Sequence, residues 1–253
     1  MRVLAAYNSK GGVGKTAAAV NLAYLASQHA RTLVWDLDPQ GAATYYFRVK
    51  PKVKGGTKKL LKKEADLSGL IRGTDFPQLD LLPSDFSYRH MDIVLEETKK
   101  PWKRLAKLLE PLADDYDTVF LDCPPSISVL SEAVFGASDA LLVPVIPTTL
   151  SVRTLEQVFS FREEYDFERV ALLPFFSMVD RRKGLHLRIL ESLTREHPEV
   201  LQTRIPYASD VEQMGVNRQP LACYAPKSPS TRAYEALWKE IQDRLKEPPW
   251  ASR

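Results

Sequence analysis

The chain has 253 residues, of which 44% are hydrophobic and 26% are charged, and this length can bury one sizeable core or at most two small ones. Thirty-five Lys and Arg residues against 32 Asp and Glu residues give a net charge of +3. So small a charge produces a weak overall field, and by itself it does not indicate a nucleic-acid partner.

The cysteines and the apolar runs exclude several classes of protein. Cys123 and Cys223 are far apart and form no Cys-x-x-Cys pair, which excludes a disulfide framework and a Cys-rich metal site. The N-terminus lacks the apolar segment and cleavage site of a secreted protein. No apolar run reaches the roughly 20 residues that a membrane-spanning helix needs, so the sequence predicts a cytoplasmic protein.

Short apolar runs rich in β-branched residues alternate with helical patterns, which is typical of βα units around a buried parallel sheet. In chain order, the expected strands are Val3–Tyr7, Thr32–Trp35, Asp80–Leu82, Thr118–Leu121, Ala140–Val145 and Val170–Phe176. The expected helices are Lys15–His29, Pro101–Asp114, Ser128–Phe135, Thr149–Glu164, Leu185–Glu196 and Thr231–Glu247. The alternation predicts an α/β fold with a doubly wound, mostly parallel sheet flanked by helices. No linker or internal repeat divides residues 1–253, so one domain is expected.

A glycine-rich loop, Lys10-Gly11-Gly12-Val13-Gly14-Lys15-Thr16, follows the first strand and leads into an Ala-rich helix near Ala17. This order of strand, loop and helix is the context of a phosphate-binding loop. Glycines let the backbone wrap around phosphates, and the helix N-terminus adds a favourable dipole. We therefore expect residues 10–17 to bind a nucleotide, with Lys15 on the β- and γ-phosphates and the Thr16 hydroxyl on Mg²⁺.

Two further strands end in carboxylates. Asp36 and Asp38 lie in the segment Asp36-Leu-Asp-Pro-Gln-Gly41, and Asp122 follows the strand Thr118–Leu121. Mg²⁺ keeps several waters and takes one or two carboxylates, so a hydrophobic strand that ends in a single carboxylate suits a Mg²⁺–phosphate site. We expect Asp122 to serve the metal and Asp36 to support its outer shell. Asp38, also near the metal, is expected to position the water that attacks the γ-phosphate.

These three segments resemble the deviant Walker A, A′ and B motifs of the ParA/MinD group of P-loop ATPases, and the ParA branch matches best. The resemblance extends over nearly the whole chain, including Ser126–Leu155, Met178–Arg182 and the segment from Tyr224 to Tyr234. It implies a single P-loop ATPase domain that hydrolyses ATP with Mg²⁺. It also implies that Met178 and Pro206 contact the nucleotide.

The resemblance gives Lys10 a role of its own. In this family the extra lysine at the start of the loop reaches across a nucleotide-sandwich dimer to the phosphates bound by the other subunit. A cation supplied in this way stabilises charge on the transferring phosphoryl group, as an arginine finger does. Lys10, Lys15 and Asp38 are therefore the expected catalytic residues of a homodimer that forms with ATP.

ParA relatives bind DNA without sequence preference as ATP-bound dimers, and a ParB-like or cargo-adaptor protein stimulates hydrolysis and releases them. The resemblance therefore implies a nucleoid-associated protein that segregates or positions a cargo. Such binding needs Lys or Arg on one face and no base-reading element. Arg182, next to Arg181, occupies the place of a DNA-contacting basic residue in the family, and the other candidates are Arg195, Arg204, Lys227 and Arg232.

Two features leave the layout of a DNA-binding face open. The family's Ile-Pro-Arg-Asn-Val-Arg-type loop reads Ile205-Pro-Tyr-Ala-Ser-Asp210 here, so an acid replaces an expected arginine. The stretch Arg48–Lys63 carries eight basic residues and no acid, and it is either a separate DNA-binding patch or a solvated loop. Because the chain begins at its first strand, we expect no helix-turn-helix domain and no operator-specific repression.

A MinD-like membrane ATPase is the alternative within the family, and it needs a C-terminal amphipathic helix with a basic face. The apolar residues of the tail have the period expected for packing against the core, and Pro248 and Pro249 would end the helix, so no stable membrane association is expected. An iron–sulfur ATPase needs two suitably placed cysteines per chain, which this sequence does not offer. A ligase or kinase remains an alternative, but no segment indicates a second-substrate pocket, and no Asn-Lys-x-Asp segment indicates GTP.

Overall fold

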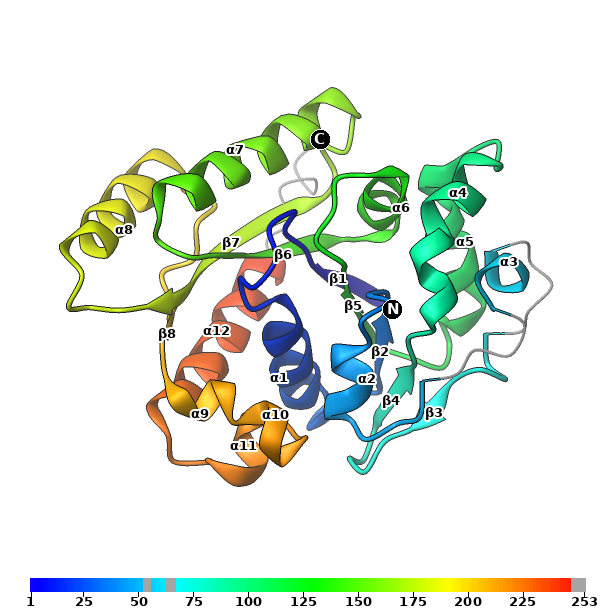
Figure 1. Cartoon of the computed structure of the whole chain (residues 1–253), viewed down its shortest axis with the longest axis horizontal. Coiled ribbons are helices and arrows are strands. Elements are labelled where there is room, and N and C mark those ends of the chain that lie inside the picture. The colour runs from blue at the N-terminus through cyan, green and yellow to red at the C-terminus, as the bar shows by residue number, and fades with distance from the viewer. Residues whose placement is uncertain (52–55, 62–66, 247–253) are drawn as a thin grey trace.

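An eight-stranded sheet organises the computed structural model of the chain, which describes residues 1–51, 56–61 and 67–246 (Figure 1). The strand order is β3-β4-β2-β5-β1-β6-β7-β8, and within the described residues β3 alone runs antiparallel to its neighbour. The strands are β1 (Arg2–Ala6), β2 (Thr32–Asp36), β3 (Arg72–Gly73), β4 (Leu79–Leu82), β5 (Thr118–Asp122), β6 (Ala140–Val145), β7 (Ala171–Val179) and β8 (Arg204–Pro206).

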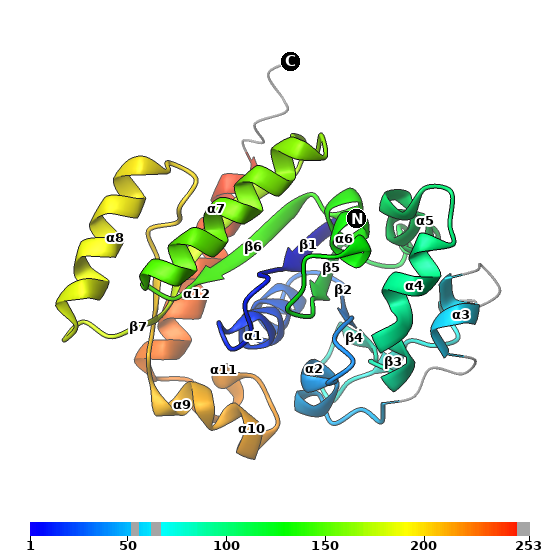
Figure 2. The same ribbon diagram turned by 45° about the horizontal axis from the view of Figure 1, so that its top comes forward.

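Helices cover both faces of this sheet. The longer ones are α1 (Lys15–Ser27), α6 (Val129–Ala137), α7 (Thr149–Glu164), α8 (Gly184–Glu196) and α12 (Pro229–Lys246). The shorter ones are α2 (Ala42–Tyr46), α3 (Gly56–Leu61), α4 (Met91–Glu96), α5 (Arg104–Leu109), α9 (Ser209–Glu212), α10 (Met214–Asn217) and α11 (Leu221–Tyr224), with 3-10 turns at Phe86–His90, Pro101–Lys103 and Glu110–Leu112. Figures 1 and 2 show α1 and α12 on one side of the sheet, and α6 and α7 on the other.

The core has two layers because successive side chains of a strand point to opposite faces of the sheet. In β1, Ala5 belongs to a buried cluster that includes residues of α6 and α7, whereas Leu4 belongs to a cluster with α1 and α12. Every residue of β2 and β5 is buried, which is the pattern of parallel strands covered on both faces. The predicted doubly wound α/β fold is confirmed.

Some predicted elements were wrong in extent. The helix expected over Pro101–Asp114 is instead the short helix α5 between two 3-10 turns. Pro111 accounts for the end of α5, because it lacks a backbone N–H and its ring clashes with the carbonyl four residues earlier. The strands β3 and β8 and the helices α2 to α4 and α9 to α11 were not predicted from the sequence. Elements of two to six residues carry too little periodicity to be recognised from sequence.

The parallel strands bring several loops to one edge of the sheet. Since β1 lies between β5 and β6, the loop after β1 sits near the middle of the carboxyl edge, flanked by the loops after β5 and β6. In open α/β sheets, ligands bind outside the carboxyl ends of the strands, where the strand order reverses direction. The glycine-rich loop follows β1 at this edge, Asp36 and Asp122 are the last residues of β2 and β5, and Asp38 lies just beyond β2.

Candidate nucleotide-binding site

The loop between β1 and α1 has the backbone of a phosphate-binding loop. Gly12 and Gly14 have backbone φ angles of 70° and 97°, which residues other than glycine rarely adopt. A Cβ atom at Gly14 would lie 2.9 Å from Ser177 Oγ, so space also requires glycine there. Gly14 is the N-cap residue of α1, and the first N–H groups of that helix therefore point toward the loop.

The two lysines of this loop make different contacts. Lys15 is 7% exposed, and its Nζ donates to the backbone oxygen of Lys10 at 3.0 Å. Burial lowers the pKa of Lys15, while Cys123 and the acids Asp122 and Asp38 oppose that shift. The Nζ of Lys10 instead donates to Ser151 Oγ, in the first turn of α7, at 3.2 Å. The loop therefore carries one buried cation and one partly exposed cation.

Asp36 and Asp122 face each other in the pairing of β2 with β5, and both are completely buried. Asp36 Oδ2 accepts hydrogen bonds from the backbone N and the Oγ1 of Thr44, at 2.8 and 2.7 Å. Neither carboxylate oxygen of Asp122 has a hydrogen-bond partner in the described part of the chain. Burial raises the pKa of Asp36 to about 6 and that of Asp122 well above its ordinary range, and neighbouring carboxyl groups add to both shifts.

A buried carboxylate without a partner, beside a phosphate loop, fits Mg²⁺, which prefers oxygen ligands and takes one or two carboxylates. The Thr16 hydroxyl lies near enough to Asp122 to oppose the rise in its pKa, and so does the charge of Lys15. Thr16 and Asp122 are therefore the residues that would hold the metal. Asp36 already accepts three hydrogen bonds, from Thr44 and from the backbone N of Asp38, which suits an outer-shell role.

Asp38 lies two residues beyond Asp36 and is partly exposed. Its Oδ1 accepts a hydrogen bond from the backbone N of Gln40 at 2.9 Å, and its backbone oxygen accepts one from Ser84 Oγ at 2.5 Å. The bond from Ser84 ties the loop after β2 to the loop after β4. The carboxylate of Asp38 affects the pKa values of both Lys15 and Asp122, so it lies close to the phosphate loop and the candidate metal site.

Comparisons with known proteins agree with this geometry. The AAA domain family matches residues 1–168. The chromosome partitioning protein ParA of Caulobacter vibrioides is 32% identical over 258 residues, which span 96% of this chain and 95% of that protein. The sporulation initiation inhibitor protein Soj of Bacillus subtilis is 30% identical over 247 residues, spanning 95% of this chain and 98% of that protein. The chain is a ParA-like P-loop ATPase of the ParA/MinD family.

A solved structure shares the fold of this ParA-like chain and shows what related proteins bind. Cobyrinic acid a,c-diamide synthase of Mycobacterium smegmatis, with a bound ATP analogue and magnesium, superposes with a TM-score of 0.80. It is 26% identical and covers 98% of this chain and 96% of its own. Nucleotide and magnesium binding therefore occur in a related protein of the same architecture.

Met178 and Pro206 of the ParA-like chain lie at the ends of β7 and β8, on the edge that carries the phosphate loop. Met178 has a φ of 54°, within a shift of register between Phe176 and Val179. Irregularities of this kind re-aim side chains next to binding sites. Ser177, the residue before Met178, abuts Gly14, and Pro206 pairs with Val179. Both residues thus lie at the carboxyl edge of the sheet, and their contact with a nucleotide stays a prediction.

The structure pairs Arg182 with an acid of its own loop. The Nε and Nη2 atoms of Arg182 donate to the two carboxylate oxygens of Asp180, at 2.9 and 3.0 Å. This pair lowers the pKa of Asp180 to about 2. The guanidinium remains 87% exposed, yet its charge is compensated by Asp180, which the sequence analysis did not anticipate. Arg181 and Lys183, on either side, are exposed.

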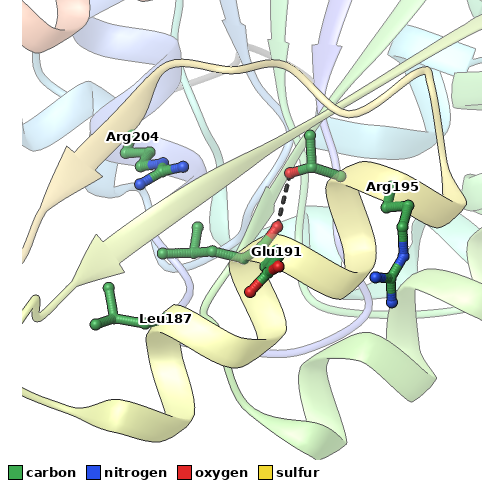
Figure 3. A pocket seen from close by; sticks show the side chains of 6 residues that line it. Leu187, Glu191, Arg195 and Arg204 are labelled. Carbon is green, nitrogen blue, oxygen red and sulfur yellow. Dashed lines mark hydrogen bonds between the residues drawn. The ribbon is translucent and has the colours of Figure 1, made fainter.

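The other DNA-binding candidates fall into separate groups. Arg195 and Arg204 line a hollow of about 320 Å³ between α8 and β8, with Leu187 and Glu191 (Figure 3). Arg195 lies in the last turn of α8, about 17 Å from the start of that helix, where the loop of Arg182 ends. A second group stands near the start of α12, where Arg232 Nη2 donates to the backbone oxygen of Lys227 at 3.1 Å.

Two departures noted in the sequence have structural contexts. Asp210, which replaces an arginine of the family, accepts a hydrogen bond from Ser230 Oγ at 2.8 Å and so joins α9 to α12. Within the basic stretch Arg48–Lys63, the residues 52–55, 62 and 63 lie outside the described residues. Arg48 forms an exposed ion pair with Asp75 at 3.2 Å, and Lys58 and Lys59 are exposed.

Sequence reasoning missed three side chains that complete the site: Thr44, Ser151 and Ser177. Thr44 satisfies Asp36, Ser151 accepts from Lys10, and Ser177 limits the space at Gly14. Thr44 and Ser151 lie near helix starts, where Ser and Thr are ordinarily explained as capping residues, and Ser177 lies within β7. The contacts of these three side chains depend on segments that are distant in sequence.

The C-terminal helix packs as predicted, because Tyr234, Leu237, Ile241 and Leu245 of α12 are buried. Pro248, Pro249 and Trp250 lie outside the described residues. In the part of the chain that the structure describes, no helix is long and apolar enough to cross a membrane. Cys123 is a buried thiol whose pKa is raised by burial, and it is not paired with Cys223.

Proposed function

We propose that this chain hydrolyses ATP with Mg²⁺, and that its ATP-bound sandwich dimer binds DNA without sequence preference. A ParB-like or cargo-adaptor protein then stimulates hydrolysis and releases the dimer. Repeated cycles segregate or position a cargo, which is a chromosome, a plasmid or a protein assembly. The family and the chromosome-partitioning name of the relative in Caulobacter vibrioides support this proposal.

One observation carries the enzymatic part: the unpartnered carboxylate of Asp122 lies beside Lys15 and Thr16 at the phosphate loop. With MgATP bound, Lys15 holds the β- and γ-phosphates, and Thr16 and Asp122 hold the metal. Mg²⁺ supplies neutralisation of the phosphate charge. Asp38, which is partly exposed at the same edge, orients the attacking water.

Exposed apolar side chains next to Lys10 support the dimer. Leu150 is 66% exposed and precedes Ser151, to which Lys10 is bonded. Ile127 is 49% exposed and lies two residues beyond Pro125, which would be 3.9 Å from a Cβ atom at Gly11. Exposed apolar groups beside a cation suit a contact with a second copy of the chain. In that contact Lys10 reaches the phosphates bound by the partner subunit.

The cations outside the site support DNA binding through phosphates. At the carboxyl edge, Arg181 and Arg182 follow β7, and Lys227 and Arg232 lie near the start of α12. A further group is formed by Arg195 and Arg204. Binding of this kind needs several cations and no element that enters a groove of the duplex. The protein would accordingly be found on the nucleoid in the cytoplasm.

A small-molecule ligase, such as the cobyrinic acid a,c-diamide synthase that shares the fold, needs a pocket for a second substrate beside ATP. The chain is 26% identical to that synthase but 32% identical to the chromosome partitioning protein ParA of Caulobacter vibrioides. The partition function is therefore the one favoured.

The rate of ATP hydrolysis per protomer, measured over a wide range of protein concentration, tests the proposal. A site completed by the partner's lysine requires that the rate rise with concentration as dimers form. Lys10→Ala should remove this rise while still binding ATP, and Lys15→Ala should abolish ATP binding. A rate per protomer that is independent of concentration and unchanged in Lys10→Ala would contradict the shared site.

A further inference from the structure

Lys10 is held at both ends within its own chain. Its Nζ donates to Ser151 Oγ at 3.2 Å, and its backbone N donates to Asn8 Oδ1 at 2.9 Å. Asn8 is completely buried and is bonded in turn to the backbone oxygen of Pro144 at 2.9 Å. The start of the phosphate loop is thus attached to the end of β6 and to the beginning of α7, 141 residues along the chain.

We propose that Ser151 is a positioning residue that retains the Lys10 ammonium within its own protomer and sets how readily the ATP dimer forms. This inference rests on the proposed function, in which Lys10 must reach the partner subunit's nucleotide. The single ammonium group of a lysine cannot bind Ser151 and a phosphate of the partner subunit at the same time. Lys10 therefore has to leave Ser151 before it can act across the dimer, and the strength of the Lys10–Ser151 bond opposes dimerisation.

The surroundings of Ser151 make this contact reversible. Ser151 is completely buried, and a buried hydroxyl without a partner is costly. Ser151 Oγ also lies 3.0 Å from Thr148 Oγ1, so it keeps a hydrogen-bond partner after Lys10 has left. A hydroxyl has one proton to donate and two lone pairs to accept with, which allows it to serve Thr148 and Lys10 together. Departure of Lys10 leaves no orphaned group in α7.

The second lysine of the loop connects this contact to the nucleotide. Lys15 Nζ donates to the backbone oxygen of Lys10 at 3.0 Å. Phosphates that draw Lys15 onto themselves remove this bond, because the ammonium prefers an anion to a neutral carbonyl. Lys10 then loses a backbone contact while its side chain is still bonded to Ser151. Nucleotide binding thus loosens the loop, and the Ser151 contact remains as the step that dimerisation must overcome.

Replacing Ser151 in two directions tests the proposal. Ser151→Ala removes the acceptor, and the dissociation constant of the dimer should fall about tenfold, since a hydrogen bond to a charged group is among the stronger ones. Ser151→Asp places an anion against Lys10 in the first turn of α7, and it should raise that constant by at least as much. Thr148→Val is the matched comparison in the opposite direction: it leaves the acceptor of Lys10 in place but removes the partner that Ser151 keeps when Lys10 departs.

Sedimentation velocity with Mg²⁺ and a slowly hydrolysed ATP analogue measures the dissociation constant of the dimer. A nucleotide titration at low protein concentration measures the ATP affinity of the monomer. Ser151→Ala should shift only the first, downward. Thr148→Val should shift only the first, upward, because Lys10 would then leave the buried Ser151 hydroxyl without the partner it has in Thr148. In the Lys10→Ala background, Ser151→Ala should have no further effect, which a merely structural role of Ser151 would not predict.

The outcomes separate this inference from the proposed function. If the wild-type protein dimerises through Lys10 but Ser151→Ala and Ser151→Asp leave the dimer constant unchanged, the role of Ser151 is overturned and the proposed function stands. The same holds if Ser151→Ala shifts the constant equally with and without Lys10. If the wild-type protein forms no dimer with the ATP analogue at any concentration, the proposed function fails, and the role of Ser151 fails with it.

Discussion

Asp36 and Asp122 stand opposite each other on β2 and β5, both completely buried at the carboxyl edge of the sheet. Burial and mutual repulsion disfavour the charged form of each group. Asp36 is compensated by Thr44, whereas Asp122 has no hydrogen-bond partner in the described part of the chain. The ionised forms of these two carboxyl groups are therefore unfavourable in the folded chain, and a bound cation would stabilise them.

Without Mg²⁺ and nucleotide, the protein should become less stable as the pH rises. The pKa of Asp36 is about 6 in the folded chain against an ordinary value of 3.8. Between these two pKa values the folded state binds more protons than the unfolded state. The stabilisation is therefore fully present below the pKa of the unfolded chain, and it is lost as the pH rises through the pKa of the folded chain. Urea denaturation at about pH 5 and about pH 8 measures the difference, which Mg²⁺ with ADP should reduce. A higher midpoint at the alkaline pH would contradict the account.

Asp122→Asn should stabilise the metal-free protein at neutral pH and abolish Mg²⁺-dependent hydrolysis. The substitution removes a buried charge that lacks a partner, which is worth about 1–3 kcal/mol in unfolding free energy. Asp36→Asn is the matched comparison, and it should destabilise, because the amide cannot accept all the hydrogen bonds that Thr44 and Asp38 donate. Equal effects of the two substitutions on the unfolding free energy would show that Asp122 does not differ from Asp36 in lacking hydrogen-bond partners.

Asp38→Ala should bind ATP and fail to hydrolyse it. Asp38 is partly exposed, and its carboxylate influences Lys15 and Asp122 without belonging to the buried pair. Loss of a group that orients water lowers the hydrolysis rate by about a hundredfold or more and leaves binding intact. Phosphate release and nucleotide retention on the same sample measure the two effects. Turnover at the wild-type rate would remove Asp38 from the mechanism.

Gly14→Ala should abolish nucleotide binding, whereas Gly11→Ala should not. Position 14 has a φ of 97°, and its new Cβ atom would lie 2.9 Å from Ser177 Oγ. Position 11 has no positive φ, and its Cβ atom would make an ordinary contact with Pro125 at 3.9 Å. Equilibrium titration with a fluorescent ATP analogue compares the two variants. Equal affinities would mean that the loop does not wrap the phosphates.

Asp180→Asn should strengthen DNA binding. The substitution releases Arg182 from the bidentate pair with Asp180, so one more cation becomes available to phosphate. DNA affinity should rise several-fold at low salt. A plot of the logarithm of the binding constant against the logarithm of the salt concentration should become steeper by about one. Arg182→Glu should do the opposite and leave ATP affinity unchanged. If neither variant changes DNA binding, Arg182 lies outside the DNA-binding face.

The sequence located the main parts of the candidate site because each is a local pattern at the end of a strand. The glycine loop, the segment from Asp36 to Gly41 and the segment from Asp122 to Pro125 meet at one edge, as parallel strands require. The motifs also indicated the number of acids near the loop. They did not indicate that Asp36 is satisfied and Asp122 is not, because that difference depends on Thr44 and on the burial of both strands.

What could not be predicted depends on contacts between distant or competing groups. Lys10 meets Ser151 only because β1 and β6 are neighbours in the sheet. The pair of Asp180 with Arg182 is close in sequence, yet the loop alone does not show whether the arginine is held by the acid or directed to solvent. The division of the basic residues into separate groups likewise follows from the length of α8 and the return of the chain through β8.

The central claim is that ATP controls the hold of this protein on DNA. A titration of the protein with duplex DNA of mixed sequence, without nucleotide, with ADP and with ATP, tests it most directly when repeated at two salt concentrations. The account predicts tight binding with ATP only, with an affinity that falls steeply as salt increases. Identical affinities in all three nucleotide conditions would contradict it.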